Sequence, residues 1–225
     1  MQVLVTGGLG YIGSHTSVLL LEKGYDLVIV DDLSNSNEKV IENISQITSK
    51  VPVFEKIDLK DKESVSKLFN NYDFDGIIHF AAHKSVNEGV NYPDKYFKNN
   101  VGSLENIIYE IQKLKKPMNF IFSSSCTVYG QADSMPINEG FELKKAESPY
   151  GQSKRKCEEI LENFHKTAHN FKNITLRYFN PIGAHPTSLI GELPIGIPEN
   201  LVPYITQTAV AVSYTHLTLP TIRTV

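Results

Sequence analysis

The chain has 225 residues, of which 41% are hydrophobic and 21% charged, and its formal net charge is −3. This composition is typical of a globular protein with one large core, and it lacks the strongly basic balance typical of nucleic-acid-binding proteins. The two cysteines show no CxxC spacing, and the sequence has neither a secretory leader nor an 18-residue apolar run, so we expect a cytoplasmic chain with free thiols, no metal and no membrane partner.

Short apolar, β-branched runs alternate with amphipathic stretches along the first 180 residues. The runs are apolar on successive positions, as in strands covered on both faces of a parallel sheet. Strands are predicted at residues 2–7, 25–31, 51–58, 74–82, 118–125 and 173–180, and helices at 11–23, 61–71, 93–116 and 150–170. This order predicts an α/β fold, a doubly wound parallel sheet (Rossmann fold) with helices on both faces.

A glycine-rich turn follows the first predicted strand. The stretch VLVTGGLGYIGSH places Gly7, Gly10 and Gly13 between that strand and an amphipathic helix. Glycine lets the backbone approach a pyrophosphate closely, and the N-terminus of the next helix then faces the anion. Asp31 ends the second predicted strand, 18 residues after Gly13, where a carboxylate can accept hydrogen bonds from an adenosine ribose. These residues together predict a dinucleotide site.

The residues around Asp31 favour NAD over NADP. The stretch DDLSNSN, at residues 31–37, has two carboxylates and neither Arg nor Lys, so a 2′-phosphate would be repelled there. Asp58 ends the third predicted strand and has two open interpretations. It caps the next helix, contacts the adenine, or does both.

A second group of polar residues follows the fifth predicted strand. FIFSSSCTVYG places Ser125 and Thr127 at the carboxyl end of that strand, where ligands bind in this architecture. SPYGQSK opens the last long helix, in which Tyr150 and Lys154 lie four residues apart and share one face. A nearby ammonium and a cationic nicotinamide both favour the phenolate, so Tyr150 is a candidate base and the two hydroxyls are candidates to orient a substrate oxygen.

These motifs together resemble the extended short-chain dehydrogenase/reductase superfamily, and within it the UDP-glucose 4-epimerase (UDP-galactose 4-epimerase) family. The matching stretches run in order from residue 1 to about residue 210. They are VLVTGGLGYIGSH, DDLSNSN, HFAAHKSV, YFKNNVGS, FSSSCTVYG, SPYGQSK and LRYFNPIGAHP.

The resemblance implies a role for each matching position. The implied NAD-binding residues are Gly7, Gly10, Tyr11, Ile12, Gly13, Asp31, Asn35, Ser36, Asp58, Leu59, Phe80, Ala81, Ala82, Lys84, Asn99, Tyr150, Lys154 and Phe179. The implied catalytic residues are Tyr150, Lys154, Ser125 and Thr127, and the implied substrate-binding residues are Ser125, Thr127, Tyr150 and Asn180. A purely structural role stays open for Phe80, Phe179 and Asn99.

The resemblance also implies an activity. Tyr150 would remove the proton of the sugar 4-hydroxyl while hydride moves from C4 to NAD, and the 4-keto sugar would turn and be reduced on its other face. UDP-galactose and UDP-glucose are interconverted in this way in galactose metabolism. The implied assembly is a homodimer through the helices at 93–116 and 150–170.

The end of the chain departs from the family. Residues 1–180 are expected to form the NAD-binding domain, 181–210 the start of the substrate-binding region, with a helix pattern from Leu201, and 211–225 an atypical tail. Family members are about half as long again, so we expect a truncated chain that lacks most of its substrate domain and turns over UDP-sugar poorly. Cys126 also stands where the family more often carries Ala.

Three other readings stay open. A nucleotide-sugar 4,6-dehydratase would need an Asp-Glu pair after the Ser-Thr, and CTVYG contains no carboxylate. An epimerase of another UDP-sugar fits the same motifs. A non-enzymatic NAD-binding protein is the third reading, against which the intact Tyr150–Lys154 pair argues.

Overall fold

The structure is a computed structural model of the chain, and it describes residues 1–196, 198 and 200–210. The predicted tail, 211–225, lies outside the described residues. Within the described part, none of the helices combines the length and hydrophobicity that crossing a bilayer requires.

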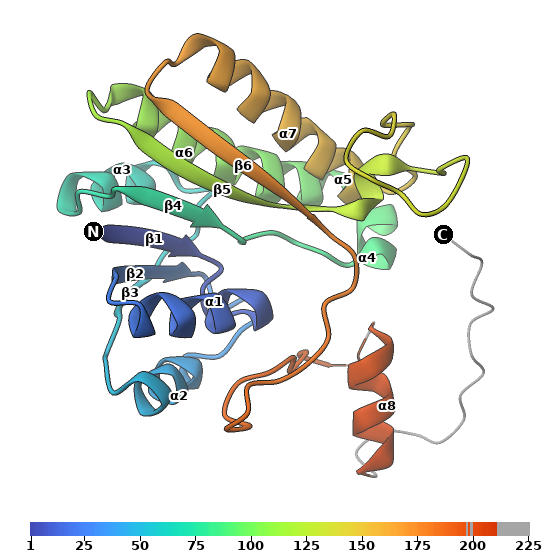
Figure 1. Cartoon of the computed structure of the whole chain (residues 1–225), viewed down its shortest axis with the longest axis horizontal. Coiled ribbons are helices and arrows are strands. Elements are labelled where there is room, and N and C mark those ends of the chain that lie inside the picture. Colours follow the sequence, from blue (N-terminus) through green and yellow to red (C-terminus); the bar gives the residue numbers. More distant parts are fainter. Residues whose placement is uncertain (197, 199, 211–225) are drawn as a thin grey trace.

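Six parallel strands form one sheet in the order β3-β2-β1-β4-β5-β6 (Figure 1). The strands are β1 (Gln2–Thr6), β2 (Asp26–Asp31), β3 (Val53–Lys56), β4 (Gly76–His79), β5 (Met118–Ser125) and β6 (Phe171–Tyr178). The order reverses between β1 and β4, and a doubly wound sheet binds its ligands beyond the carboxyl ends of the strands at this point. The predicted fold class is confirmed.

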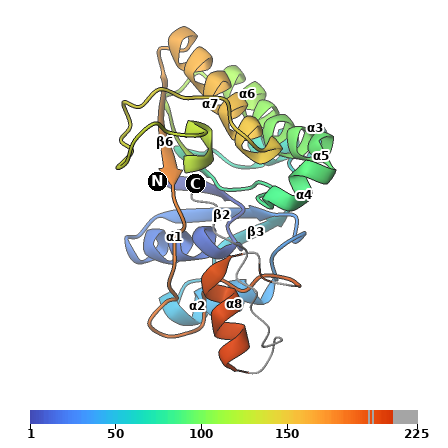
Figure 2. The same cartoon turned by 90° about the vertical axis from the view of Figure 1, so that its right-hand side faces the viewer.

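Helices cover both faces of the sheet (Figures 1 and 2). On one face lie α1 (Tyr11–Glu22) and α2 (Lys39–Thr48), and on the other lie α3 (Lys62–Asn71), α6 (Gly102–Lys113) and α7 (Pro149–Thr167). Successive strand residues point to opposite faces, so Val3 and Val5 join the core under α1 and α2 while Leu4 joins the core under α6 and α7. Both faces are therefore buried, as the continuous apolar runs predict.

The helices differ from the prediction in two places. The helix expected at 93–116 is divided into α5 (Pro93–Tyr96), a π-helical turn (Phe97–Val101) and α6, after the short α4 (Val86–Asn91). The π-helical turn buries Asn99 and Asn100 beside the site described below. The chain also forms α2, an element that the predicted order lacks.

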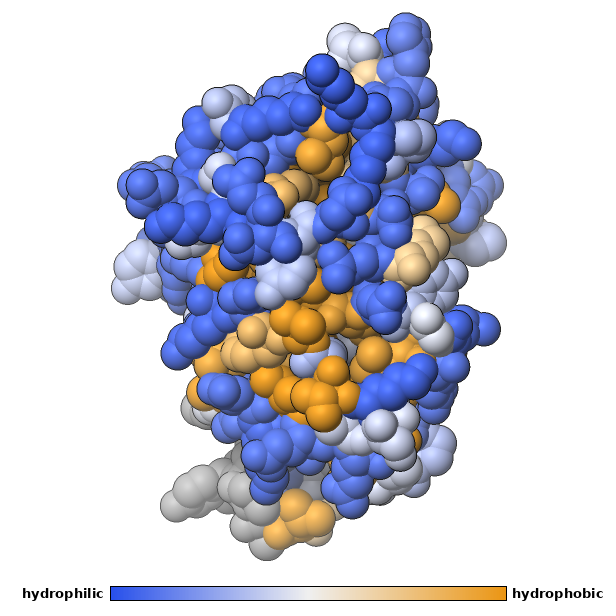
Figure 3. Space-filling view, turned by 90° about the vertical axis from the view of Figure 1, so that its left-hand side faces the viewer, coloured by the Kyte–Doolittle hydropathy of each residue, from blue (hydrophilic) through white to orange (hydrophobic). Residues whose placement is uncertain are grey.

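Residues 181–196 leave β6 and run past the carboxyl ends of the strands to the layer of α1 and α2, before α8 (Leu201–Ala209) (Figure 1). Ile190 is 4% exposed and packs with the core under α1 and α2, and the Asn43 side chain donates to the Leu189 carbonyl at 2.8 Å. Seen from the amino ends of the strands, the surface shows hydrophobic side chains mainly across its middle, between polar regions (Figure 3). The polar site lies at the opposite edge.

Candidate active site at the carboxyl ends of the strands

A cavity of about 770 Å³ opens at the carboxyl ends of the strands. Its lining comes from the turns after each of the strands β1 to β5, from the start of α7 and from the segment after β6. It includes every site residue predicted from the sequence: Gly7, Gly10, Tyr11, Ile12, Gly13, Asp31, Asn35, Ser36, Asp58, Leu59, Phe80, Ala81, Ala82, Lys84, Asn99, Ser125, Thr127, Tyr150, Lys154, Phe179 and Asn180. Residues far apart in sequence therefore meet in one hollow.

The turn after β1 is packed so closely that Gly7 and Gly13 have no room for a side chain. Gly7 has φ of 65°, and a Cβ on Gly13 would lie 2.2 Å from the Gly7 carbonyl oxygen. Gly10 is the N-cap of α1, and no side chain caps this helix. The first N–H groups of α1 thus face the cavity rim without a side-chain partner, which fits a phosphate group.

Asp31 is held rigidly at the end of β2. Its Oδ2 accepts from the Leu9 N–H at 3.1 Å, and its Oδ1 accepts from the Leu33 N–H at 3.0 Å and the Ser36 hydroxyl at 2.7 Å. The carboxylate is 8% exposed and faces the cavity. Ser36, which the resemblance implies to be an NAD-binding residue, lies against this carboxylate.

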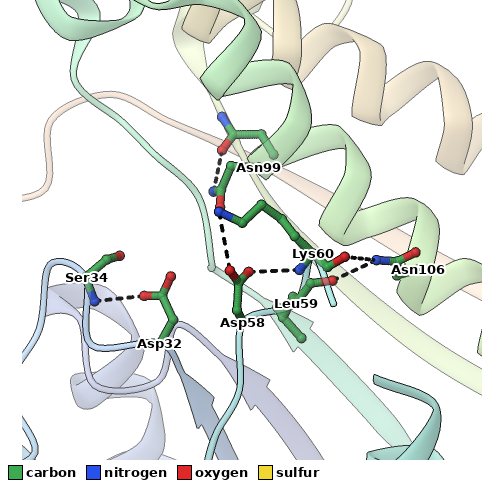
Figure 4. Close-up of polar contacts among 8 residues, drawn as sticks. Asp32, Ser34, Asp58, Leu59, Lys60, Asn99 and Asn106 are labelled. Carbon is green, nitrogen blue, oxygen red and sulfur yellow. Dashed lines mark hydrogen bonds and ion pairs between the residues drawn. The ribbon is translucent and has the colours of Figure 1, made fainter. Parts of the chain in front are cut away.

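Asp58 and Leu59 line the cavity just after β3, the strand that neighbours β2 (Figure 4). The Asp58 carboxylate accepts from the Lys60 N–H at 3.0 Å and pairs with the Lys60 ammonium at 3.4 Å, while Asn106 donates to the Leu59 carbonyl at 2.9 Å. The N-cap of α3 is Asp61, which accepts from the Glu63 N–H at 3.1 Å. The reading of Asp58 as the helix cap is therefore wrong, and its carboxylate borders the cavity instead.

The catalytic candidates meet at the other end of the cavity. Lys154 is 2% exposed, donates to the Ser123 carbonyl at 2.7 Å and has its Nζ 5.9 Å from the centre of the Tyr150 ring. The Thr127 hydroxyl donates to the Ser125 hydroxyl at 3.0 Å. Two hydroxyls, a phenol and an ammonium thus line the same end of the cavity, where they can exchange protons with a bound hydroxyl group.

Burial is the largest influence on the pKa values of Tyr150 and Lys154. Burial raises the pKa of Tyr150, while the Ser125 hydroxyl lowers it and Cys126 raises it further. Burial lowers the pKa of Lys154 to about 8, against opposing effects of Cys157 and Glu158. The sequence predicted a Tyr150 pKa lowered by Lys154, but burial is the larger effect on the phenol in this structure.

The three residues with open structural readings differ in their surroundings. Phe179 is 57% exposed, so it is not a core aromatic. Phe80 packs partly against the core under α1 and α2 while it lines the cavity. Asn99 is buried, and its amide donates to the Asn100 side-chain oxygen at 3.1 Å. Only Phe179 has no packing role.

The cavity also contains residues that the sequence did not point to. Glu192 pairs with Lys84 at 3.3 Å, and its carboxylate also accepts from Asn200. The Tyr11 hydroxyl donates to the Gly183 carbonyl at 2.8 Å. These contacts come from residues 181–200, where the sequence has no strand or helix periodicity, so only the fold reveals them. Across the described residues, no group of three or more His, Cys, Asp or Glu side chains is arranged to hold a metal ion.

Comparison with known proteins identifies relatives of this chain. A family model described as GDP-mannose 4,6 dehydratase matches residues 4–209. The UDP-glucose 4-epimerase uge1 of Schizosaccharomyces pombe is 47% identical over 212 residues, which are 92% of this chain and 59% of that protein. The UDP-glucose 4-epimerase of Bacillus subtilis is 46% identical over 210 residues, 93% of this chain and 61% of that protein.

Solved structures agree with these relatives. The crystal structure of UDP-glucose 4-epimerase from Bifidobacterium longum in complex with NAD+ and UDP has a TM-score of 0.91 and 40% identity, and the match covers 95% of this chain and 63% of that one. The UDP-glucose 4-epimerase from Stenotrophomonas maltophila with bound NAD and formylated UDP-arabinopyranose has a TM-score of 0.90 and 43% identity, with the same coverage. The chain thus spans less than two thirds of the length of these relatives. The chain belongs to the family that the GDP-mannose 4,6 dehydratase model describes, within the extended short-chain dehydrogenase/reductase superfamily.

Proposed function

We propose that this chain carries the NAD-binding and catalytic part of a UDP-glucose 4-epimerase, which interconverts UDP-galactose and UDP-glucose by reversible oxidation at C4. The observation that carries the proposal is one cavity with a phosphate-sized glycine turn and Asp31 at one end and Tyr150, Lys154 and Ser125 at the other. The relatives named UDP-glucose 4-epimerase support the proposal, as do two similar epimerase structures, one in complex with NAD+ and UDP and one with bound NAD and formylated UDP-arabinopyranose.

The residues present fit NAD. The uncapped start of α1 suits the pyrophosphate, Asp31 suits the adenosine ribose, and no Arg or Lys lines the loop after β2 to bind a 2′-phosphate. The other cavity-lining residues predicted from the sequence, Asp58, Lys84 and Asn99 among them, are proposed to hold the rest of the cofactor. When bound, NAD accepts a hydride from the sugar C4 and returns it.

The chain's own residues perform the proton chemistry. Tyr150 takes the proton of the 4-hydroxyl, which Ser125 and Thr127 hold in place, and it returns the proton to the C4 oxygen when the turned 4-keto sugar is reduced on its other face. Because burial raises the pKa of Tyr150, the phenolate needs positive charge beside it. Lys154 supplies part of that charge, since its pKa of about 8 keeps most of it protonated at pH 7. Asn180 is proposed to contact the sugar nucleotide.

The dehydratase name of the family model raises a rival reaction. Elimination of water from the sugar requires an acid and a base near the neighbouring carbons. The turn after β5, Cys126–Tyr129, contains no carboxylate. An epimerase therefore fits the site better than a dehydratase.

We make three further proposals about the domains, the assembly and the location of this chain. Residues 1–180 act as the cofactor domain and 181–210 as the start of the substrate region. A homodimer through α6 and α7 is proposed from the family resemblance alone. A cytoplasmic location is supported by the two free thiols, Cys126 and Cys157.

The test is an assay of the purified chain with UDP-galactose, in which UDP-glucose is measured by a coupled enzyme and bound NAD by fluorescence. Because the chain spans less than two thirds of its relatives' length, we expect retained NAD and slow but measurable epimer formation, and a further loss of rate of at least about 100-fold in Tyr150→Phe. Tyr109→Phe is the matched control, because Tyr109 is 44% exposed on α6, away from the cavity. Retained NAD without product would identify a binding protein without turnover, and a 4-keto-6-deoxy product would identify a dehydratase. Either result overturns the proposal.

A further inference from the structure

A second polar cluster lies directly behind the catalytic residues. Its members are Ser124, Tyr129, Glu158 and Arg177, and of these only Ser124 lines the cavity. The Arg177 guanidinium donates to both oxygens of Glu158, at 3.0 and 2.8 Å, in the bidentate geometry that gives the strongest ion pairs. Ser124 donates to the same carboxylate at 2.5 Å, and Arg177 also donates to the Tyr129 hydroxyl at 3.0 Å.

The cluster joins the elements that supply the catalytic groups. Glu158 lies on α7, one turn after Lys154, and Tyr129 ends the turn that holds Thr127. Ser124 and Arg177 are register partners on β5 and β6. Every one of these positions is within a few residues of a group that faces the cavity.

The two neighbours of Ser124 on β5 connect this cluster to the catalytic groups. The Ser123 carbonyl accepts a hydrogen bond from the Lys154 ammonium, and the Ser125 hydroxyl accepts one from the Thr127 hydroxyl. Ser124 therefore lies between two residues that contact catalytic groups. A shift of α7 against β5 would therefore move Lys154 and the two hydroxyls relative to each other. A single carboxylate that binds both β5 and β6 opposes that shift.

The cluster is largely shielded from water. The side chain of Glu158 is 11% exposed and that of Arg177 is 22% exposed. The hydrogen bond to Glu158 is the main reason that the pKa of Arg177 is raised, so the guanidinium stays charged. The carboxylate also opposes the lowering of the Lys154 pKa by burial.

We propose that Glu158 and Arg177 are positioning residues for the catalytic site, which fix α7 and the turn after β5 against the sheet and keep Lys154 beside a carboxylate. This proposal rests on the proposed epimerase function. The rival explanation is that the pair only stabilises the fold.

The first test replaces one charge. Glu158→Gln keeps the shape of the side chain, and we expect kcat to fall about 10- to 100-fold, with KM and retained NAD changed by less than about three-fold. Without the carboxylate the pKa of Lys154 falls, so the alkaline limb of the kcat profile moves to lower pH. Glu159→Gln is the matched control, since Glu159 is the exposed neighbour that pairs with Lys156. It leaves the rate and the profile unchanged.

The second test separates positioning from stability. A buried charge without a partner destabilises the fold, so Glu158→Gln combined with Arg177→Met recovers melting temperature relative to Glu158→Gln alone. Under the positioning proposal kcat stays low in the double variant, because α7 and β5 remain unlinked. A double variant that recovers both melting temperature and kcat would overturn the proposal.

The third measurement needs neither substrate nor cofactor. In NMR spectra of protein labelled with ¹³C-lysine, the Lys154 signal is identified as the one that is missing from Lys154→Met. Its titration with pH is then compared between the wild-type protein and Glu158→Gln. We expect a lower pKa in the variant, and an unchanged pKa together with an unchanged kcat would contradict the proposal. If the wild-type chain forms no UDP-glucose, the epimerase proposal fails by itself, and this titration still decides whether Glu158 controls Lys154.

Discussion

At the residue scale, His79 shows how the sheet centre under the cavity is kept neutral. His79 ends β4, is 1% exposed, and its Nδ1 lies 2.7 Å from the Thr6 hydroxyl. Its ring stacks on Phe122 with a centroid distance of 6.0 Å, and the Lys154 ammonium lies 4.9 Å from the centre of the same Phe122 ring. Burial, with a smaller effect of Lys154, lowers the pKa of His79 to about 3.

This environment predicts a loss of stability in mild acid. The folded state binds fewer protons than the unfolded state between pH 3 and pH 6.5, so the free energy of unfolding falls as the pH drops below 6.5. Between pH 6.5 and pH 5 the loss is about 2 kcal/mol, from about 1.4 kcal/mol for each pH unit. Urea unfolding at several pH values measures it, and His79→Asn removes most of this slope.

His83 is the matched control for His79. Its pKa is also lowered by burial, but it is half-buried, so its contribution to the slope is smaller. His83→Asn should therefore keep most of the acid sensitivity. If the two variants lost the same share of the slope, His79 would not be the main buried histidine that titrates on unfolding.

At the element scale, the strands and most helix starts were predictable because their patterns are local. β5 matches its predicted range, and Ser148 caps α7 with Pro149 in the first turn, as the sequence predicts. The π-helical turn at Phe97–Val101 has no local signature, since it depends on Asn100 bonding to His83 and Ser153 across the fold. α2 does carry a signal, because Val40, Ile41 and Ile44 have helical spacing.

The start of α3 distinguishes Asp61, which caps the helix, from Asp58, which the sequence leaves as a candidate cap. Asp61→Ala removes the N-cap bonds to the Glu63 N–H and the Ser64 hydroxyl, so we expect the melting temperature to fall by roughly 2 to 4 °C. Asp58→Ala removes no cap, so it should leave the melting temperature nearly unchanged but weaken NAD retention. Thermal unfolding of both variants with and without added NAD measures this. A larger loss of stability in Asp58→Ala would contradict the assignment of the cap.

At the scale of the whole molecule, the candidate site was predictable where motifs sit beside strand ends. Sequence order puts Gly7, Asp31 and Ser125 at carboxyl ends, and a parallel sheet brings such ends to one edge, so their meeting in one cavity follows from topology. The Glu192–Lys84 pair and the Glu158–Arg177 pair were not predictable. Each joins segments whose approach depends on packing rather than on strand order.

Residues 181–196 are the part of the molecule whose position depends most on such packing. They join the β6 side of the cavity to the α1 and α2 side through Ile190, the Leu189 carbonyl and Glu192. Ile190 is 4% exposed, whereas Leu193 is 83% exposed three residues later. A charge at Ile190 would be buried without a partner, but a charge at Leu193 would stay in water.

Ile190→Asp should therefore release this segment from the core while the sheet remains folded. We expect faster cleavage within residues 181–196 by a low concentration of protease, and weaker NAD retention, because the released segment no longer covers the cavity that Lys84 and Tyr11 line. Leu193→Asp is the control and should be cleaved at the wild-type rate. The far-ultraviolet circular dichroism of both variants should match the wild type, since the six strands and the helices that cover them are untouched. Equal cleavage of the two variants would mean that Ile190 does not anchor the segment, and the join across the cavity would then depend on its polar contacts with Lys84, Asn43 and Tyr11.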